Sequence, residues 1–151
     1  PLPAGQGQGI AVHRSFVSYI AIAVRVRVLG RKMWIEQVDL AIDCGLAVHP
    51  ERIRSQMEGS VVFGISLAMM GKATMKKGAV EQSNFHDAPV ARITDAKPKI
   101  NVSLIQSDAP PGGVGEPGVP PFAPALCNAL FAATGKRIRS LPINEYDLAE
   151  A

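Results

Sequence analysis

The chain has 151 residues, of which 47% are hydrophobic, and this is enough for one domain with an apolar core. Its net charge of +3 comes from scattered side chains, and only 5% of its residues are aromatic, so the composition argues against a protein that binds nucleic acid. The longest apolar run, residues 61–70, is about half of the length that crosses a membrane, so no transmembrane segment is expected.

The N-terminal segment and the two cysteines indicate how the chain is organised. Residues 1–9 are rich in Gly, Gln and Pro and are expected to form a loop or linker, followed by a single domain over residues 10–151. The two cysteines, Cys44 and Cys127, lie far apart and have no histidine or cysteine neighbours at the spacing of a zinc site. They are predicted to be reduced, buried thiols.

The first regular elements are predicted to be strands. Polarity alternates over residues 15–30, which indicates one long, half-buried strand. A turn leads to a second strand over residues 33–43, with Trp34 and Val38 expected on the same side. The two strands are predicted to pair as an antiparallel hairpin.

The period changes over residues 49–70, where a helix is predicted. Apolar residues recur at every fourth position, which places them near one face of a helix, and Pro50 suits its first turn. Gly59 and Gly64 weaken such a helix. They suggest either that a ligand approaches the backbone closely or that the helix packs tightly.

The remaining elements complete an α+β pattern. A short hairpin is expected over residues 72–82, a strand over residues 99–107, and a helix over residues 122–134 with Gly135 as its C-cap. Mostly antiparallel strands with two main helices predict a two-layer α+β domain, in which a mainly antiparallel or mixed sheet packs against both helices.

A rigid loop over residues 112–124 contains a single ionisable group, Glu116. Its "GVGEPG" stretch, residues 113–118, matches the glycine pattern of dinucleotide-binding folds. That interpretation fails because "SDAPP" separates the glycines from the preceding strand and prolines delay the following helix.

Two interpretations of Glu116 remain open on the residues alone. A carboxylate held by a restricted backbone can serve as a general base whose pKa is raised by desolvation. The alternative is a surface turn whose carboxylate stabilises the N-terminus of the next helix. Gln56 raises a similar choice, because it can bind a polar ligand or lie on an exposed helical face.

Four stretches together resemble a known family. "QMEGSVVFG" (56–64) and "GGVGEPGVPPFAPALCNALFAATGKRIRSLP" (112–142) are similar to the molybdenum-cofactor-binding large subunit of the xanthine oxidase family. "VDLAIDCGLAVHP" (38–50) and "VEQSNFHD" (80–87) fit its subgroup of isoquinoline 1-oxidoreductase beta subunits and bacterial aldehyde dehydrogenases. The resemblance runs from about residue 9 to residue 143, and it identifies the chain as the C-terminal part of such a large subunit.

The resemblance implies specific roles for three residues. Glu116 matches the general base of the family, Gln56 matches a glutamine that hydrogen-bonds the pterin, and Gly115 matches a glycine close to the metal centre. No residue of this chain is expected to ligate a metal. The implied reaction oxidises an aldehyde or an N-heterocycle with oxygen derived from water.

The resemblance also implies cofactors and partners. The cofactor would be molybdenum–molybdopterin cytosine dinucleotide, and electrons would leave through iron–sulfur clusters in a small partner subunit. The upstream half of the large subunit would be a further partner, without which this part of the enzyme would be inactive. A bacterial enzyme of the periplasm or the cytoplasm is implied. The alternative is a non-catalytic scaffold or interaction domain that retains the fold.

Overall fold

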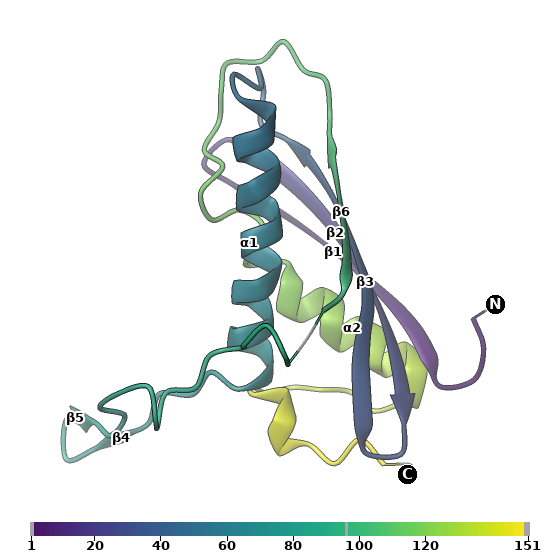
Figure 1. Ribbon diagram of the computed structural model, residues 1–151, viewed down its shortest axis with the longest axis vertical. Coiled ribbons are helices and arrows are strands. Elements are labelled where there is room, and N and C mark those ends of the chain that lie inside the picture. The colour runs from purple at the N-terminus through teal and green to yellow at the C-terminus, as the bar shows by residue number, and fades with distance from the viewer. Residues whose placement is uncertain (1, 96, 150–151) are drawn as a thin grey trace.

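The computed structural model describes residues 2–95 and 97–149 and consists of two helices, six strands and one 3-10 turn within those ranges (Figure 1). Both expected helices are present, and so are the hairpin predicted from residues 15–30 and 33–43 and the later short hairpin. In chain order the elements are β1 (Gln6–Ser15), β2 (Ser18–Leu29), β3 (Lys32–Asp43), α1 (Pro50–Met69), β4 (Met75–Lys76), β5 (Ala79–Val80), β6 (Lys99–Leu104), α2 (Phe122–Thr134) and the 3-10 turn η1 (Ile143–Glu145).

The main sheet has the strand order β1-β2-β3-β6. The β1–β2 and β2–β3 pairs are antiparallel, whereas β3 and β6 are parallel. Both helices lie on the same side of this sheet, and β4 and β5 form a separate hairpin that extends away from it (Figure 1). The predicted two-layer α+β architecture with a mixed sheet is therefore confirmed.

The core lies between the sheet and the helices, and the sequence periods place the residues that fill it. Alternate residues of β2 are buried, as the period of two predicts, and the four-residue spacing of α1 buries one side of that helix. These core residues are Ile20, Ile22, Val24 and Val26 of β2, and Ile53, Met57, Val61 and Ile65 of α1.

The predicted face of Trp34 is wrong, and a β-bulge explains the error. The β2–β3 register pairs Arg25 with Gln37 and then Val26 with Ile35, so Glu36 is an extra residue. An extra residue exchanges the two faces of the strand on one side of the bulge. Ile35 is consequently buried, whereas Trp34 lies on the outer face under the Arg27 guanidinium, 4.2 Å from the ring centroid.

The beginning of the chain also differs from the expectation. Residues 6–9, predicted as loop, already belong to β1. The strand expected over residues 15–30 begins only at Ser18, because Phe16 and Val17 form a two-residue turn and Ser15 is the last residue of β1.

Glycines in β1 allow helix α2 to lie directly against the sheet. A Cβ atom added to Gly9 would collide with the Ala125 carbonyl oxygen and the Ala129 backbone nitrogen of α2. Gly64 of α1 plays the same part between the helices, because a Cβ there would collide with the Phe122 ring. Of the two explanations for the α1 glycines, tight packing therefore accounts for Gly64, whereas Gly59 has open space around it.

A pair of alanine substitutions tests this packing. We expect Gly9→Ala to lower the free energy of unfolding by about 1–3 kcal/mol, because the added methyl group meets helix backbone that cannot rotate away. Gly59→Ala, the matched control in open helix, should raise it by about 0.5–1 kcal/mol. Urea unfolding of the two variants measures both changes, and a neutral Gly9→Ala would contradict the packing.

Candidate functional site

The loop that carries Glu116 is fixed at its upstream end by backbone hydrogen bonds. The Gly112 N–H donates to the Cys44 carbonyl oxygen at the end of β3, at 2.8 Å. The Gly113 N–H donates to the Phe16 carbonyl oxygen in the β1–β2 turn, also at 2.8 Å. The Ser18 hydroxyl donates to the Gly113 carbonyl oxygen at 2.7 Å. Two segments distant in sequence therefore hold the loop three to four residues before Glu116.

The downstream end of the loop is a tight turn against α1. The Val119 N–H donates to the Glu116 carbonyl oxygen at 2.9 Å, which closes a β-turn with Pro117 at its preferred second position. Pro117 and Gly118 are buried. Gly118 is required for space, because a Cβ there would collide with the buried Ser60 side chain of α1.

Helix α1 brings Gln56 to this loop. The helix begins at Pro50, and the His49 side chain caps it by accepting a hydrogen bond from the Arg52 N–H at 3.3 Å. One and a half turns later, Gln56 donates from Nε2 to the Gly115 carbonyl oxygen at 3.3 Å. The structure thus brings together Gln56, Gly115 and, as the next residue, Glu116.

The Glu116 side chain is exposed and makes no hydrogen bond or ion pair with any residue that the structure describes. The alternative role, stabilisation of the α2 N-terminus, is not supported by the helix itself. Helix α2 has Pro121 at its N-cap, no side-chain cap and no acidic residue in its first turn. The loop therefore presents one carboxylate on a backbone that is fixed on both sides.

Neither thiol is activated as a nucleophile. Burial raises the pKa of the Cys44 thiol, and the same desolvation raises the pKa of Cys127. A raised pKa leaves less of the reactive thiolate at neutral pH. No cluster of three or more His, Cys, Asp or Glu side chains that could hold a metal ion occurs within residues 2–95 and 97–149.

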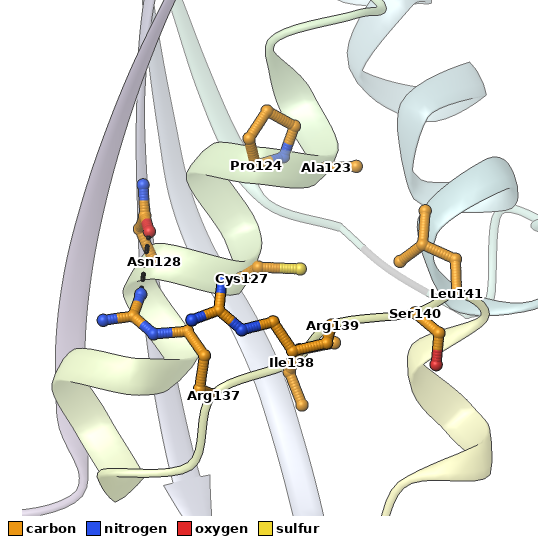
Figure 2. Close-up of a pocket in the computed structure, with 9 residues that line it drawn as sticks. All are labelled: Ala123, Pro124, Cys127, Asn128, Arg137, Ile138, Arg139, Ser140 and Leu141. Atoms are coloured by element: carbon orange, nitrogen blue, oxygen red, sulfur yellow. Dashed lines mark hydrogen bonds between the residues drawn. The ribbon is translucent and has the colours of Figure 1, made fainter.

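A separate cavity of about 330 Å³ lies between α2 and the segment that follows it (Figure 2). Arg137 donates to the Asn128 Oδ1 atom at 3.3 Å, and its guanidinium lies 3.5 Å from the centroid of the Phe131 ring. Cys127 lines the same cavity. None of Gln56, Gly115 and Glu116 does, so the cavity is distinct from the candidate site.

Ser18 and Phe16 contact the candidate loop, although the sequence did not single them out. They lie 95 or more residues before Gly113 in the chain. Phe16 and Val17 both have positive φ angles, 51° and 68°. Neither residue type favours that conformation, so no turn signal marks the position.

Several known proteins are similar to this chain in sequence and in fold. Residues 4–97 match the model of the molybdopterin cofactor-binding domain, and the chain belongs to that family. It is 38% identical over 109 residues to the beta chain of isoquinoline 1-oxidoreductase from Brevundimonas diminuta, covering 72% of this chain and 14% of the relative. It is 32% identical over 110 residues to one of the subunits of nicotinate dehydrogenase from Pseudomonas putida, covering 72% of this chain and 9% of the relative. The resemblance to molybdenum-cofactor-binding subunits that the motifs indicated is confirmed.

Solved structures agree on the fold. The aldehyde oxidoreductase from Desulfovibrio gigas superposes with a TM-score of 0.69 over 83% of this chain and 14% of its own, at 23% identity. Neither helix in the described part of the chain is long and apolar enough to span a bilayer.

The raised thiol pKa values predict slow alkylation. Because the folded thiols lose their protons at higher pH than the unfolded ones, iodoacetamide should label the native chain far more slowly at pH 8 than the urea-unfolded chain. The labelling rate of the native chain should still be rising at pH values where that of the unfolded chain has levelled off. Mass spectrometry of timed samples measures both. Equal native and unfolded rates would contradict the assigned thiol environments.

Proposed function

We propose that this chain is part of a molybdenum hydroxylase that oxidises an aldehyde or an N-heterocycle with oxygen derived from water, and that Glu116 is its general base. The observation that supports this most directly is the arrangement of the loop. One exposed carboxylate stands on a backbone fixed by the β1–β2 turn, by β3 and by α1, and it is engaged with no other described side chain.

Glu116 would act by accepting a proton at a carboxylate oxygen from the water-derived nucleophile. A base of this kind must be deprotonated, accessible and held within hydrogen-bond reach of the proton that it removes. Exposure gives access, and the hydrogen bonds of the loop backbone limit the positions that the carboxylate can adopt. The oxidation removes two electrons from the substrate, and Glu116 assists only the proton transfer.

The donor set around the loop fits a pterin cofactor. Gln56 is exposed, and with its Nε2 engaged to Gly115 its Oε1 remains able to accept from a polar ligand edge. A Cβ added to Gly115 would meet nothing within 4 Å, so there is space for a ligand over the backbone at this residue. When bound, the molybdenum cofactor would supply the redox chemistry, while Gln56 would hydrogen-bond its pterin and Gly115 would lie close to its metal centre.

The cofactor and partners in this proposal are the ones that the family resemblance implies. The pterin would be the cytosine dinucleotide form, and the electrons would pass to iron–sulfur clusters in a small partner subunit. The chain spans 14% of the isoquinoline relative and 9% of the nicotinate relative. The remaining part of a large subunit would supply further contacts to the cofactor and the substrate pocket.

The proposed base is tested by Glu116→Gln in a complete large subunit that contains this domain, assembled with its iron–sulfur subunit. Removal of a positioned base costs about 10²–10⁴-fold in rate, and we expect a loss of kcat of at least that order. The measurement is aldehyde- or heterocycle-dependent dye reduction, normalised to bound molybdenum.

The matched control is Glu81→Gln, the same isosteric change at an exposed glutamate of the β4–β5 hairpin. Its rate should equal that of the parent enzyme. A Glu116→Gln enzyme that holds its molybdenum and reacts within a few-fold of the parent would refute the role of Glu116 and favour a structural loop.

A further inference from the structure

The β1–β2 turn adopts a conformation that its residues disfavour. Phe16 and Val17 occupy the two central positions of a two-residue hairpin with φ angles of 51° and 68°. Asn and Gly are the usual residues there, and a β-branched residue such as Val17 is an outlier. Burial does not explain the conformation, because 61% of Phe16 and 67% of Val17 is exposed.

The contacts of the turn show what this conformation holds in place. The Phe16 carbonyl oxygen accepts the Gly113 N–H, and the Ser18 hydroxyl donates to the Gly113 carbonyl oxygen. Ser18 is fully buried, so its hydroxyl depends on this partner. A Cβ on Gly113 would collide with the Phe16 side chain, so the loop lies directly on the turn. A single loop residue is thus bound through both of its backbone polar groups.

Backbone conformations of this kind persist where the surroundings determine them, and they gather at functional sites. Gly113 lies three residues before Glu116, and the next fixed point along the loop is Gly115, which Gln56 contacts. Only Val114 and Gly115 separate the Gly113 peptide from Glu116, so a shift of that peptide would also move Glu116.

We propose that Ser18 is a positioning residue for Glu116: with the Phe16 carbonyl it fixes the Gly113 peptide and so sets where the carboxylate stands. This inference rests on the proposed role of Glu116 as the base. Ser18 would touch neither substrate nor cofactor and would act only through the loop.

The turn contains its own control residue. Ser15 is the register partner of Ser18 at the other end of the turn. Its buried hydroxyl oxygen has no hydrogen-bond partner among the residues that the structure describes. Ser15→Ala and Ser18→Ala therefore each remove a serine hydroxyl oxygen at one end of the turn. Only Ser18→Ala removes a hydrogen bond to the loop that carries Glu116.

The experiment compares Ser18→Ala, Ser15→Ala and Ser18→Thr in the complete enzyme, with rates normalised to bound molybdenum. A small misplacement of a catalytic group can cost about 100-fold. We expect Ser18→Ala to lower kcat by about 10- to 100-fold with KM within about twofold. Ser15→Ala should match the parent, and Ser18→Thr, which keeps the hydroxyl, should recover most of the rate.

A second readout does not depend on activity. In the complete enzyme, amide hydrogen exchange of the peptide covering residues 112–116 should be faster in Ser18→Ala than in Ser15→Ala, because the Gly113 peptide is no longer held on both sides. Equal exchange in the two variants would overturn the inference even if both enzymes were slower than the parent.

The activity outcomes separate this inference from the proposed function. A large loss in Glu116→Gln without any loss in Ser18→Ala would overturn the positioning role alone. Equal losses in Ser18→Ala and Ser15→Ala would also overturn it, because damage to the turn would then be the cause. An undiminished rate in Glu116→Gln would overturn both proposals.

Discussion

Backbone hydrogen bonds to the loop over residues 112–119 are the interactions on which the candidate site depends. The Cys44 and Phe16 carbonyl oxygens accept from Gly112 and Gly113, and the turn from Glu116 to Val119 closes the other end. The loop can therefore carry an exposed carboxylate and still hold one conformation, because its backbone is hydrogen-bonded and Pro117 removes freedom from the unfolded chain. Glycine is needed where neighbours come closest, as at Gly118 beside Ser60.

The architecture beneath the loop supplies these anchors. The sheet brings the β1–β2 turn and the end of β3 to the same end of the domain, and α1 runs alongside that end with Gln56 and Ser60 toward the loop. The glycines of β1 let α2 approach the sheet at backbone distance, so the helix that follows the loop is fixed as well. Three distant parts of the chain thus determine where a single carboxylate stands.

Most of the regular structure followed from hydrophobic period and capping residues. The four-residue spacing of α1, the Gly135 cap of α2 and the alternation in β2 are local signals, and the structure has all three elements. The errors arose where tertiary context overrides such signals. Strand β1 has glycine in place of apolar side chains at positions 7 and 9, where helix α2 covers it. The bulge at Glu36 reverses the faces of Trp34 and Ile35, and no local sequence pattern marks it.

The candidate site was predictable only in part. Gln56, Gly115 and Glu116 were named through resemblance to a family, and the structure adds that Gln56 donates to the Gly115 carbonyl oxygen. Spacing alone could not pair Gln56 with a residue 59 positions later, nor mark Ser18, whose partner is 95 positions away. Such contacts depend on how the strands and helices are arranged and not on any local pattern.

The loop that carries Glu116 is rigid although the carboxylate itself is exposed, and backbone 15N relaxation of this chain tests that rigidity directly. We expect order parameters of about 0.85 for the backbone N–H groups of residues 112–116, 118 and 119, equal to those of helix α2 and typical of rigid backbone. Values below about 0.6 across the loop would contradict the account, because a carboxylate on a mobile loop is not held in place by the anchors described above.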